Sequence, residues 1–517
     1  AGEGERMRQR HLAYYVDLAE RAEPNLRARA MVMWLDWLDA EHDNIRIALE
    51  WAQESNVESQ LRLAISLLWF WHIRGHKHEG TDALERGLSI EALERGDQPL
   101  TPDRAQLRGK ALNAAGFLRL MFSETDKGES FSEESLSLFR GLGEEGKRGM
   151  AYALWNLSIV ASQRINVPRR KALLNDALAL FRETNDRFGM AQCLEGLGFC
   201  ALDENDYERA LTLMQEHLAL RREIGDQDGV ALAFLGLGHM AFQRRDYKQA
   251  QGHYEVSLAL FHEVGNRWAK SMALSNLGRL AQAMGAYGQA TIMLEEALIL
   301  GRELGDKFVV ARRLGELGLV AGSQGDYERA TELHEGALRL FQEMDNKFFI
   351  AIRSVDLGLI ALAQGNDQRA AQRFEDALTL SKETEDRFGT AFALYGLGKV
   401  QQSQDSYTSA RALYLEAIVF FQELNDPIGA AYCLEVLAIL ATIQNQMKRA
   451  ACLFGASEKF YAPLRFEMLA KERTEHNQAI AIARATLGEE TFAAAWEEGK
   501  KMTLDQAIEY ALEESHD

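Results

Sequence analysis

The feature that most constrains this chain is a spacing of 40 residues that repeats without insertion or deletion through its middle. A glycine preceded by leucine recurs at this spacing, and an alanine stands twelve residues after each glycine. The two columns are Gly198, Gly238, Gly278, Gly318, Gly358 and Gly398, and Ala210, Ala250, Ala290, Ala330, Ala370 and Ala410. Small residues at fixed positions mark helix contacts, so the spacing predicts one structural unit per 40 residues.

Each unit is predicted to be a pair of helices. Residues 186–226 carry apolar side chains at helical spacing on both sides of a polar break, and Asp206 is placed to cap the second helix. A column of N-cap residues precedes the first helices and reads Asp186, Asp226, Asn266, Asp306, Asn346, Asp386 and Asp426. Because neither helix can bury its apolar stripe alone, the pairs must stack, which predicts an all-α solenoid with a concave and a convex face.

The Leu-Gly and Ala spacing, with a further small residue seven positions on, resembles tetratricopeptide repeats. The further column reads Ala177, Ala297, Ala337, Ala377 and Ala417, and it departs from the pattern at His217 and Ser257. The resemblance implies a right-handed α-solenoid superhelix of about ten helical hairpins. Tetratricopeptide units usually have a period of about 34 residues. We therefore place the additional residues of each unit in a longer second helix and its turn.

Weaker pairs extend the array in both directions. They are predicted at about Leu61–Ile90, Arg104–Arg140, Lys147–Phe181 and Pro427–Phe460. Pro463 marks the end of the repeats, and two helices at about Leu464–Leu487 and Glu489–Leu512 are expected to cap the array. The predicted organisation is a helical arm or linker at residues 1–60, a solenoid at 61–462 and capping helices at 463–517.

Charge and composition exclude several classes of protein. The net charge of −19 repels phosphate backbones and no basic stripe offsets it, so no direct nucleic-acid contact is expected. No apolar run approaches the roughly 18–20 residues of a membrane-spanning helix. Four cysteines, of which Cys193 and Cys200 would lie about 10 Å apart along one helix, predict no disulfide framework and fit a reducing cytoplasm. Because the first residue is Ala1, we expect an excised fragment.

The segment Gly141–Arg148, GLGEEGKR, nearly matches the phosphate-binding P-loop, GxxxxGK followed by Ser or Thr. A working P-loop follows a strand and places its hydroxyl residue on Mg²⁺, whereas here Arg148 replaces that residue and the segment lies between two helical pairs. We interpret the segment as a glycine-rich helix end. Since no nucleophile and base stand in a recognisable arrangement, neither enzyme activity nor a cofactor is expected.

The segment WHIRGHKHEG contains His72, His76 and His78. Two histidines four residues apart can share a metal ion when they lie on one helix. Alignment with the later rows places a turn between these histidines. The preferred interpretation is therefore a solvated turn with no metal, and the alternative is a true metal site.

The residues that face the groove are predicted from columns one, four and eight positions after the leading alanine of each first helix. These columns vary far more from row to row than the packing columns, as expected of a binding surface. The candidate ligand-binding residues are Phe199, His239, Phe242, Arg279, Arg312, Phe392, Tyr395, Lys399 and Tyr432. They favour a ligand with apolar and anionic parts, or a peptide. The alternative is ordinary packing between repeats with solvated charges.

Segments near both ends carry a more particular resemblance. WLDWLDAEHDNIRIALEWA (Trp34–Ala52), LFGASEKFYAPL and ATLGEETFAAAWEEGKKMTLDQAIEYAL resemble parts of bacterial signalling ATPases of the STAND class, many of which carry DNA-binding or other effector domains. The resemblance implies that a P-loop NTPase and a winged helix lie upstream of Ala1, and that this chain is the tetratricopeptide sensor. The Walker motifs of that family have no counterpart here.

The function implied by the resemblance is inducer recognition in the concave groove, together with an intramolecular brake on the upstream module. The inducer would be a small molecule, a peptide or a protein. The alternative function is a free-standing tetratricopeptide scaffold that mediates protein–protein interaction.

Overall fold

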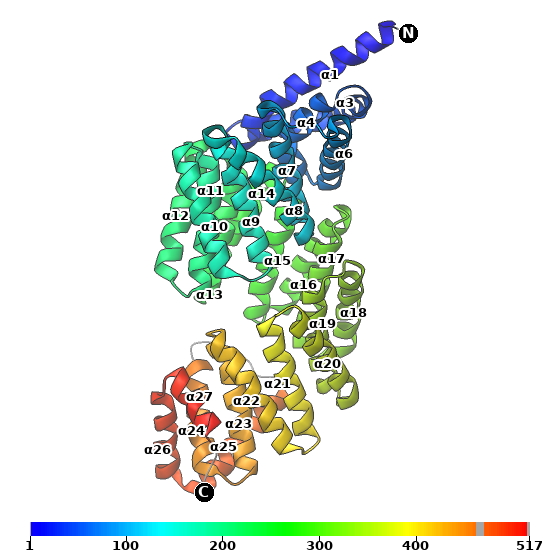
Figure 1. The fold of residues 1–517 in the computed structure, drawn as a ribbon. Coiled ribbons are helices and arrows are strands. Elements are labelled where there is room, and N and C mark those ends of the chain that lie inside the picture. Colours follow the sequence, from blue (N-terminus) through cyan, green and yellow to red (C-terminus); the bar gives the residue numbers. More distant parts are fainter. Residues whose placement is uncertain (1, 462–469, 514–517) are drawn as a thin grey trace. The chain divides into compact units, whose positions relative to one another are not determined.

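The computed structural model describes residues 2–461 and 470–513, which form α-helices, two short 3-10 helices and no strand (Figure 1). The chain divides into two compact units, Ala1–Phe308 and Val309–Asp517. Successive helices pack as pairs, so the prediction of an all-α solenoid is confirmed. Among the helices of the described residues, none combines the length and the apolar character needed to cross a membrane.

The first unit contains an irregular N-terminal segment followed by regular pairs. The segment consists of α1 (Gly2–Ala22), η1 (Glu23–Arg27), α2 (Met31–Ala40), α3 (His42–Ser55), α4 (Val57–Ser66), α5 (Leu68–Arg74) and α6 (Lys77–Arg95). The pairs are α7 (Pro102–Met121) with α8 (Thr125–Gly141), and, after η2 (Gly143–Gly146), α9 (Lys147–Gln163) with α10 (Val167–Glu183), α11 (Arg187–Asp203) with α12 (Tyr207–Ile224), α13 (Gln227–Gln243) with α14 (Tyr247–Val264), and α15 (Arg267–Ala283) with α16 (Tyr287–Glu303).

The second unit continues the series of paired helices. Its first helix, α17, starts at Lys307, two residues before the boundary between the units. Its helices are α17 (Lys307–Ser323), α18 (Tyr327–Glu343), α19 (Lys347–Ala363), α20 (Asp367–Glu383), α21 (Arg387–Ser403), α22 (Tyr407–Glu423), α23 (Pro427–Ile443), α24 (Met447–Tyr461), α25 (Ala470–Leu487), α26 (Glu489–Lys501) and α27 (Leu504–Leu512). The pair predicted at residues 427–460 is therefore present as α23 and α24.

The irregular segment is fixed to the last pairs of its own unit. Helices α2 and α5 contact α14 and α15. The Arg74 guanidinium donates a hydrogen bond of 2.9 Å to the carbonyl of Val264, and the Lys77 ammonium group lies 3.8 Å from the Asp306 carboxylate. Residues nearly 200 positions apart in the sequence thus hold the two ends of this unit together.

The turns repeat at half the predicted spacing. One residue in every 20 has a positive φ, which ends a helix in the left-handed conformation. The series is Ile165, Asn185, Asn205, Gly225, Arg245, Gly265, Gly285, Gly305, Gly325, Asp345, Gly365, Glu385, Asp405, Asn425 and Asn445. Both helices of a pair accordingly have 17 or 18 residues, as in α11 and α12. The prediction that the additional residues lie in the second helix and its turn is wrong, because the two halves of each unit have equal length.

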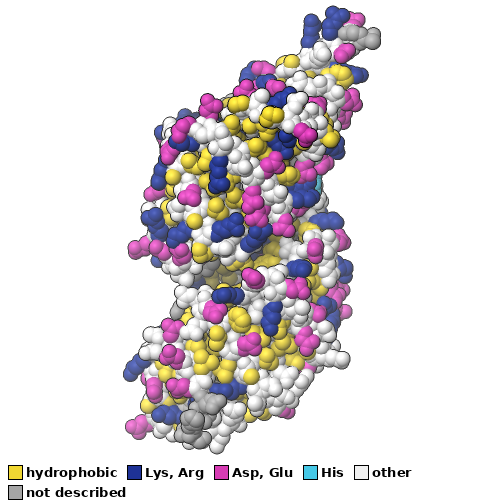
Figure 2. Space-filling view, in the orientation of Figure 1, with side chains coloured by type: hydrophobic (Ala, Val, Ile, Leu, Met, Phe, Trp, Pro, Cys, Tyr) yellow, Lys and Arg dark blue, Asp and Glu magenta, His cyan; other side chains and the backbone are white. Residues whose placement is uncertain are grey.

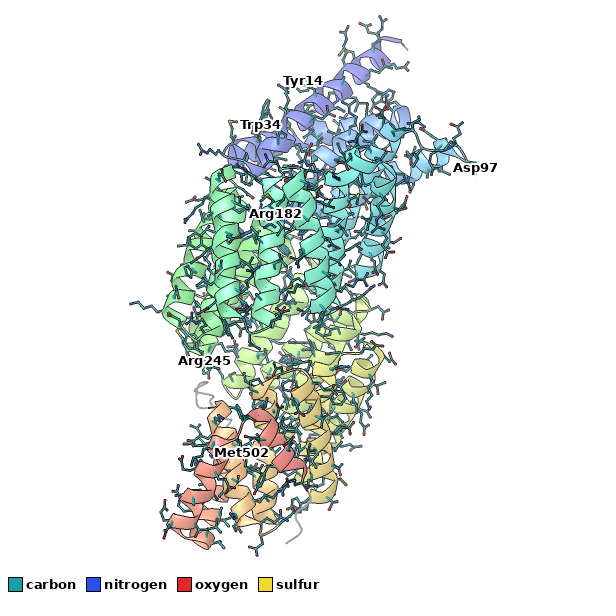
Figure 3. The ribbon with its side chains drawn as sticks, turned by 60° about the vertical axis from the view of Figure 1, so that its left-hand side comes forward. Tyr14, Trp34, Asp97, Arg182, Arg245 and Met502 are labelled. Atoms are coloured by element: carbon teal, nitrogen blue, oxygen red, sulfur yellow. The ribbon has the colours of Figure 1, made fainter. Side chains whose placement is uncertain are left out.

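The residue after most of these left-handed turns caps the next helix with its side chain, with Ala286 and Ser406 as exceptions. The side chains of Asp186, Asp226, Asn266, Asn346, Asp386 and Asp426 accept hydrogen bonds from backbone N–H groups in the first turn of the helix that follows. Asp206 accepts from the N–H of Arg209 in the same way, as predicted. Arg245, labelled in Figure 3, shows the arrangement: it adopts φ 60° and is followed by the cap residue Asp246.

The small-residue columns lie where the helices of a pair meet. All six alanines of the first column are fully buried. A Cβ atom on Gly278 would lie 2.8 Å from Cγ of Leu294 and 3.3 Å from the carbonyl of Ala290, closer than carbon atoms ordinarily approach. At the two departures in the second column, polar atoms bond to the preceding first helix: His217 Nδ1 lies 2.7 Å from the carbonyl of Ala191, and Ser257 donates to that of Ala231 at 2.8 Å. Each polar replacement thus makes a hydrogen bond to a backbone carbonyl inside the core.

The C-terminal helices differ from the prediction in number. The segment expected as one helix at 489–512 is two, α26 and α27, because the Thr503 hydroxyl accepts from the N–H of Gln506 while the Gln506 side chain accepts from the N–H of Thr503. This reciprocal capping box starts a new helix. Pro463 and the first residues of the helix expected from Leu464 lie outside the described residues. The division at residues 60 and 462 stays a prediction.

Candidate functional site

A pocket of about 280 Å³ lies within the first unit, among η1, α5, α7 and α9. Helices α7 and α9 begin successive pairs and contact each other directly. The 3-10 helix η1 and the helix α5 contact one another and close the opposite side. The pocket is therefore bounded by the irregular segment on one side and by first helices of the array on the other.

Aromatic side chains form the apolar part of the lining. The ring of Phe117 lies between those of Trp69 and Trp155, with centroid separations of 5.4 Å and 5.3 Å. Phe117 and Trp155 are buried, and Trp69 is half-buried. Three rings in contact offer a surface for stacking of a planar or aliphatic group.

Charged groups stand around this aromatic surface. The Arg27 guanidinium lies 5.8 Å from the Trp69 ring and donates to the Tyr152 hydroxyl at 3.3 Å. Tyr152 donates to Asp186 at 3.0 Å, and Arg148 donates to the same carboxylate at 2.7 Å. Although burial opposes it, the N–H of Gly189 and the Arg148 guanidinium lower the pKa of Asp186. The carboxylate therefore stays ionised and holds two pocket residues in place.

Three cations and two acids line the pocket in all. The cations are Arg27, Lys110 and Arg148, and the acids are Glu23 and Glu145. Lys110 is exposed. On the face drawn in Figure 2, basic and acidic side chains are intermingled as well. Arg27 pairs with Glu23 and Arg148 pairs with Asp186, so an anionic group of a ligand would be best placed near Lys110.

Two asparagines in the lining are only half satisfied. The Asn113 amide NH₂ donates to the carbonyl of Gly149 at 3.0 Å, and that of Asn156 donates to the carbonyl of Asn113 at 2.9 Å. These donations fix which way each amide points. The Oδ1 atoms of both are buried and accept no hydrogen bond from the described part of the chain. Since an unsatisfied buried acceptor costs about 1–3 kcal/mol, either a water molecule or a ligand that donates hydrogen bonds would satisfy the pair.

None of the nine groove residues predicted from the sequence lines this pocket. Four of them form a row on α11, α13 and α15. The rings of Phe199 and His239 lie 6.2 Å apart, and the Arg279 guanidinium is 5.7 Å from the ring of Phe242. Burial and the charge of Arg279 lower the pKa of His239 to about 4, so its imidazole is neutral at physiological pH.

The other five belong to the second unit. Tyr395 on α21 lies 6.0 Å from Tyr432 on α23, and the Lys399 ammonium is 5.8 Å from the Tyr395 ring. Phe392 packs edge-on against the buried Phe421 at 5.1 Å. Arg312 lies on α17, where its guanidinium is 6.0 Å from the ring of Phe349. The structure thus groups these residues separately in each unit, and part of their surface contributes to packing.

The sequence did contain a signal for the pocket. Two of the columns that we interpreted as groove-facing contain Gln192 and Glu195. Forty residues earlier, the same columns contain Tyr152 and Trp155. Both line the pocket. The contributions of Arg27 and Trp69 could not be found in this way, because they come from the irregular segment.

The near P-loop is a turn between helices, as predicted. Residues 141–148 contain the end of α8, the helix η2 and the start of α9, so a helix rather than a strand precedes Lys147. The Lys147 ammonium forms ion pairs with Glu144 at 2.6 Å and Glu183 at 2.9 Å. The four cysteines are buried free thiols whose pKa is raised by burial.

Comparison with known families bears on the regular pairs. Residues 229–303, 270–343, 309–383 and 350–423 each match the family model described as tetratricopeptide repeat. The matches together span residues 229–423, so this part of the chain is similar to tetratricopeptide repeats. Such repeats form modules for interaction with other molecules, which agrees with a solenoid that presents an extended binding surface. No curated protein matches the chain in sequence.

Several solved structures have a similar arrangement of helices. A Rap protein complexed with Competence and Sporulation Factor superposes with a TM-score of 0.53 at 12% identity, over 71% of this chain and 99% of that one. BtubC from P. vanneervenii gives a TM-score of 0.37 at 21% identity, over 43% and 92%. A STAND protein with a tetratricopeptide repeat sensor from Pyrococcus horikoshii gives 0.46 at 16% identity, over 66% and 53%. Of these three, the Rap protein alone exceeds a TM-score of 0.5, and at 12% identity its likeness concerns the fold alone.

Proposed function

We propose that this chain is the ligand-sensing and autoinhibitory module of a STAND-type signalling ATPase or regulator, and that its inducer binds in the pocket among η1, α5, α7 and α9. The observation that supports a ligand is the pocket itself, which is lined by three aromatic rings, by Lys110 and by the side chains of Asn113 and Asn156. The observation that favours the STAND assignment is the sequence of the two flanks, Trp34–Ala52 and the segment that ends at Leu512.

The lining defines the chemistry of the inducer. The inducer is expected to carry N–H or O–H donors for the two asparagines and an apolar group for the surface of Trp69, Phe117 and Trp155. It should also carry an anionic group that lies near Lys110. A short peptide meets all three requirements, since its backbone N–H groups, side chains and carboxylate supply them. A small acidic aromatic or aliphatic molecule with amide or hydroxyl groups is the other class that fits.

The position of the pocket suggests how binding acts on an upstream module. Arg27 belongs to the arm before residue 61, whereas Asn113 and Asn156 belong to the paired helices. A ligand that contacts both parts changes the free energy of their association. The free energy by which the ligand can shift the NTPase between two states equals the difference between its binding free energies for the two arrangements of arm and repeats.

The second candidate function is a free-standing scaffold that binds a partner protein through the tetratricopeptide repeats. The two functions differ in the gene upstream of Ala1. A Walker A motif followed by a winged helix would support the sensor, and a start codon directly before Ala1 would eliminate it.

The pocket is tested by ligand capture with a matched pair of variants. The chain is incubated with the low-molecular-mass fraction of a lysate of its source organism, repurified and examined by native mass spectrometry. Once the ligand is identified by its mass, its affinity is measured for the wild type, Asn156→Ala and Asn276→Ala. Asn276 stands in the same repeat column as Asn156, but its amide donates to Met272 of its own helix.

Asn156→Ala should weaken binding about three- to tenfold, as expected for the loss of one hydrogen bond of about 0.5–1.5 kcal/mol, while Asn276→Ala leaves it unchanged. Lys110→Ala, an exposed change that leaves the fold intact, should weaken an anionic ligand. Phe392→Ala with Tyr395→Ala addresses the groove of the second unit. If that double variant weakens binding and Asn156→Ala does not, the site is on α21 and the pocket assignment is wrong.

A further inference from the structure

The turn between α5 and α6 brings one histidine of the WHIRGHKHEG segment together with two residues that the sequence did not single out. His76 immediately precedes α6, Glu79 lies in the first turn of α6, and His42 begins α3. One ligating atom from each of the three side chains lies within 4.8 Å of the other two. Two imidazole nitrogens and one carboxylate oxygen are a donor set suited to Zn²⁺ and related divalent ions.

The other two histidines of the segment are excluded from this cluster by their packing. His72 is buried on α5, where its ring lies 5.0 Å from that of Phe117. His78 stacks on Phe122 with a centroid separation of 4.4 Å. The turn predicted between His72 and His76 is present, with Gly75 at φ 89°. It separates those two histidines and directs His76 toward α3 instead.

The three groups already lie close to the separations that a metal ion imposes. His42 Nε2 is 2.9 Å from Glu79 Oε1, and the centroids of the two imidazole rings are 4.2 Å apart. Ligands at about 2.0–2.1 Å from a tetrahedral ion lie roughly 3.3 Å from one another. Small rotations of the side chains therefore suffice to place one ion between them.

Outer contacts orient the carboxylate. The Arg46 guanidinium donates to Glu79 Oε2 at 2.8 Å, and the Trp71 indole N–H lies 3.3 Å from Oε1. The ring of Phe70 packs 5.2 Å from His42 and 5.7 Å from His76. Partners of this kind fix the orientation of metal ligands, although the positive charge of Arg46 lowers the affinity for a dication.

We propose that His42, His76 and Glu79 form a binding site for a divalent transition-metal ion such as Zn²⁺. The ion joins the first residue of α3 to the first turn of α6. It replaces the hydrogen bond between His42 and Glu79 as the link between these helices. The site is structural, and it is independent of the pocket that we assign to the inducer.

The test is a titration of the chain with ZnCl₂, after purification without a polyhistidine tag and removal of metals with a chelator. Isothermal titration calorimetry should show one equivalent bound. His76→Ala should lower the affinity at least tenfold, and His78→Ala, a change in the same turn, should leave it unaltered. Co²⁺ in place of Zn²⁺ should give visible absorption bands that His76→Ala abolishes.

Since His42 is buried, substitution there risks the fold, and Glu79→Gln serves as the second variant. It preserves the shape of the side chain and should also weaken Zn²⁺ at least tenfold, with circular dichroism to show that the helices persist. Absence of saturable binding by the wild type would overturn the proposal. Equal binding by the wild type and His76→Ala would do so too, since the metal would then bind elsewhere.

Discussion

The regular repeats, residues 165–446, and the irregular N-terminal segment, residues 2–101, bury their side chains by different means. In the repeats a left-handed turn ends a helix every 20 residues. In the N-terminal segment helices range from 7 residues in α5 to 21 in α1, and their turns follow no fixed interval. The pocket lies between the irregular segment and the helices α7 and α9, which precede the 20-residue turn series, and the His42 cluster lies wholly in the irregular segment. Regular spacing thus favours close packing, and its interruption leaves room for ligands.

The strongest test of the regular region is Gly278→Leu. The added side chain would overlap Leu294 and the backbone at Ala290. We expect a loss of about 1–3 kcal/mol in the free energy of unfolding, as overpacked cores show, measured by chemical denaturation. The control is Gly288→Leu on α16, where a Cβ meets no atom within 4 Å. Equal losses in the two variants would mean that the glycine column does not set the spacing between helices.

A buried carboxylate within the repeats provides a test by pH. Burial first, and then the charge of Asp226, raises the pKa of Asp228 to about 7, although Asn266 donates a hydrogen bond of 2.8 Å to it. Between about pH 4 and pH 7 the folded state holds a proton that the unfolded state has lost, so this group's contribution to stability falls as the pH rises through that window. Asp228→Asn keeps the oxygen that accepts from Asn266 and removes the charge.

Asp228→Asn should therefore raise the melting temperature at pH 8, with a gain in stability on the order of 1–3 kcal/mol, and change it little at pH 4. The matched variant is Asp326→Asn at an exposed cap, where asparagine serves equally well. A gain at pH 8 that persists undiminished at pH 4 would contradict the assignment of a buried charge.

Ile165 marks the start of the regular repeats, and its substitution is expected to give a smaller effect. It is the first member of the 20-residue series and adopts φ 55°, a conformation that β-branched side chains rarely take. Ile165→Gly should raise stability by about 0.5–1 kcal/mol, because glycine accepts this conformation without steric cost. Gly325→Ala, at φ 81° in a later turn of the series, should lower it by a similar amount. Changes of the same sign in both variants would show that the conformation is not what matters.

The smallest expected effect is that of Lys147→Ala. The lysine pairs with Glu144 and Glu183 at a helix start, and no strand precedes it. We expect no magnesium-dependent ATP hydrolysis by the wild type or the variant, and a slight change in melting temperature. Hydrolysis by the wild type that disappears in Lys147→Ala would restore the P-loop hypothesis.

The sequence was sufficient for features that repeat and insufficient for those that do not. The cap column at Asp186 and the glycine column at Gly278 were predictable because each recurs at fixed spacing next to the same partners. The contact between Arg27 and Tyr152 joins residues 125 positions apart, and no period relates them. Likewise His42 meets Glu79 only because the chain turns at Gly75. Such contacts depend on how the irregular helices fold back, which local patterns do not specify.

The 20-residue turn series has a consequence for how such a protein can change its length. Every helix from α11 to α24 starts in the same phase, so a deletion of 40 residues removes one pair and rejoins equivalent positions. Excision of residues 387–426, for example, would place Asp386 directly before Pro427, where Asp426 now caps α23. Evolution or design can therefore lengthen and shorten the array in whole pairs, whereas the N-terminal segment, which lacks a common phase, has to be inherited intact.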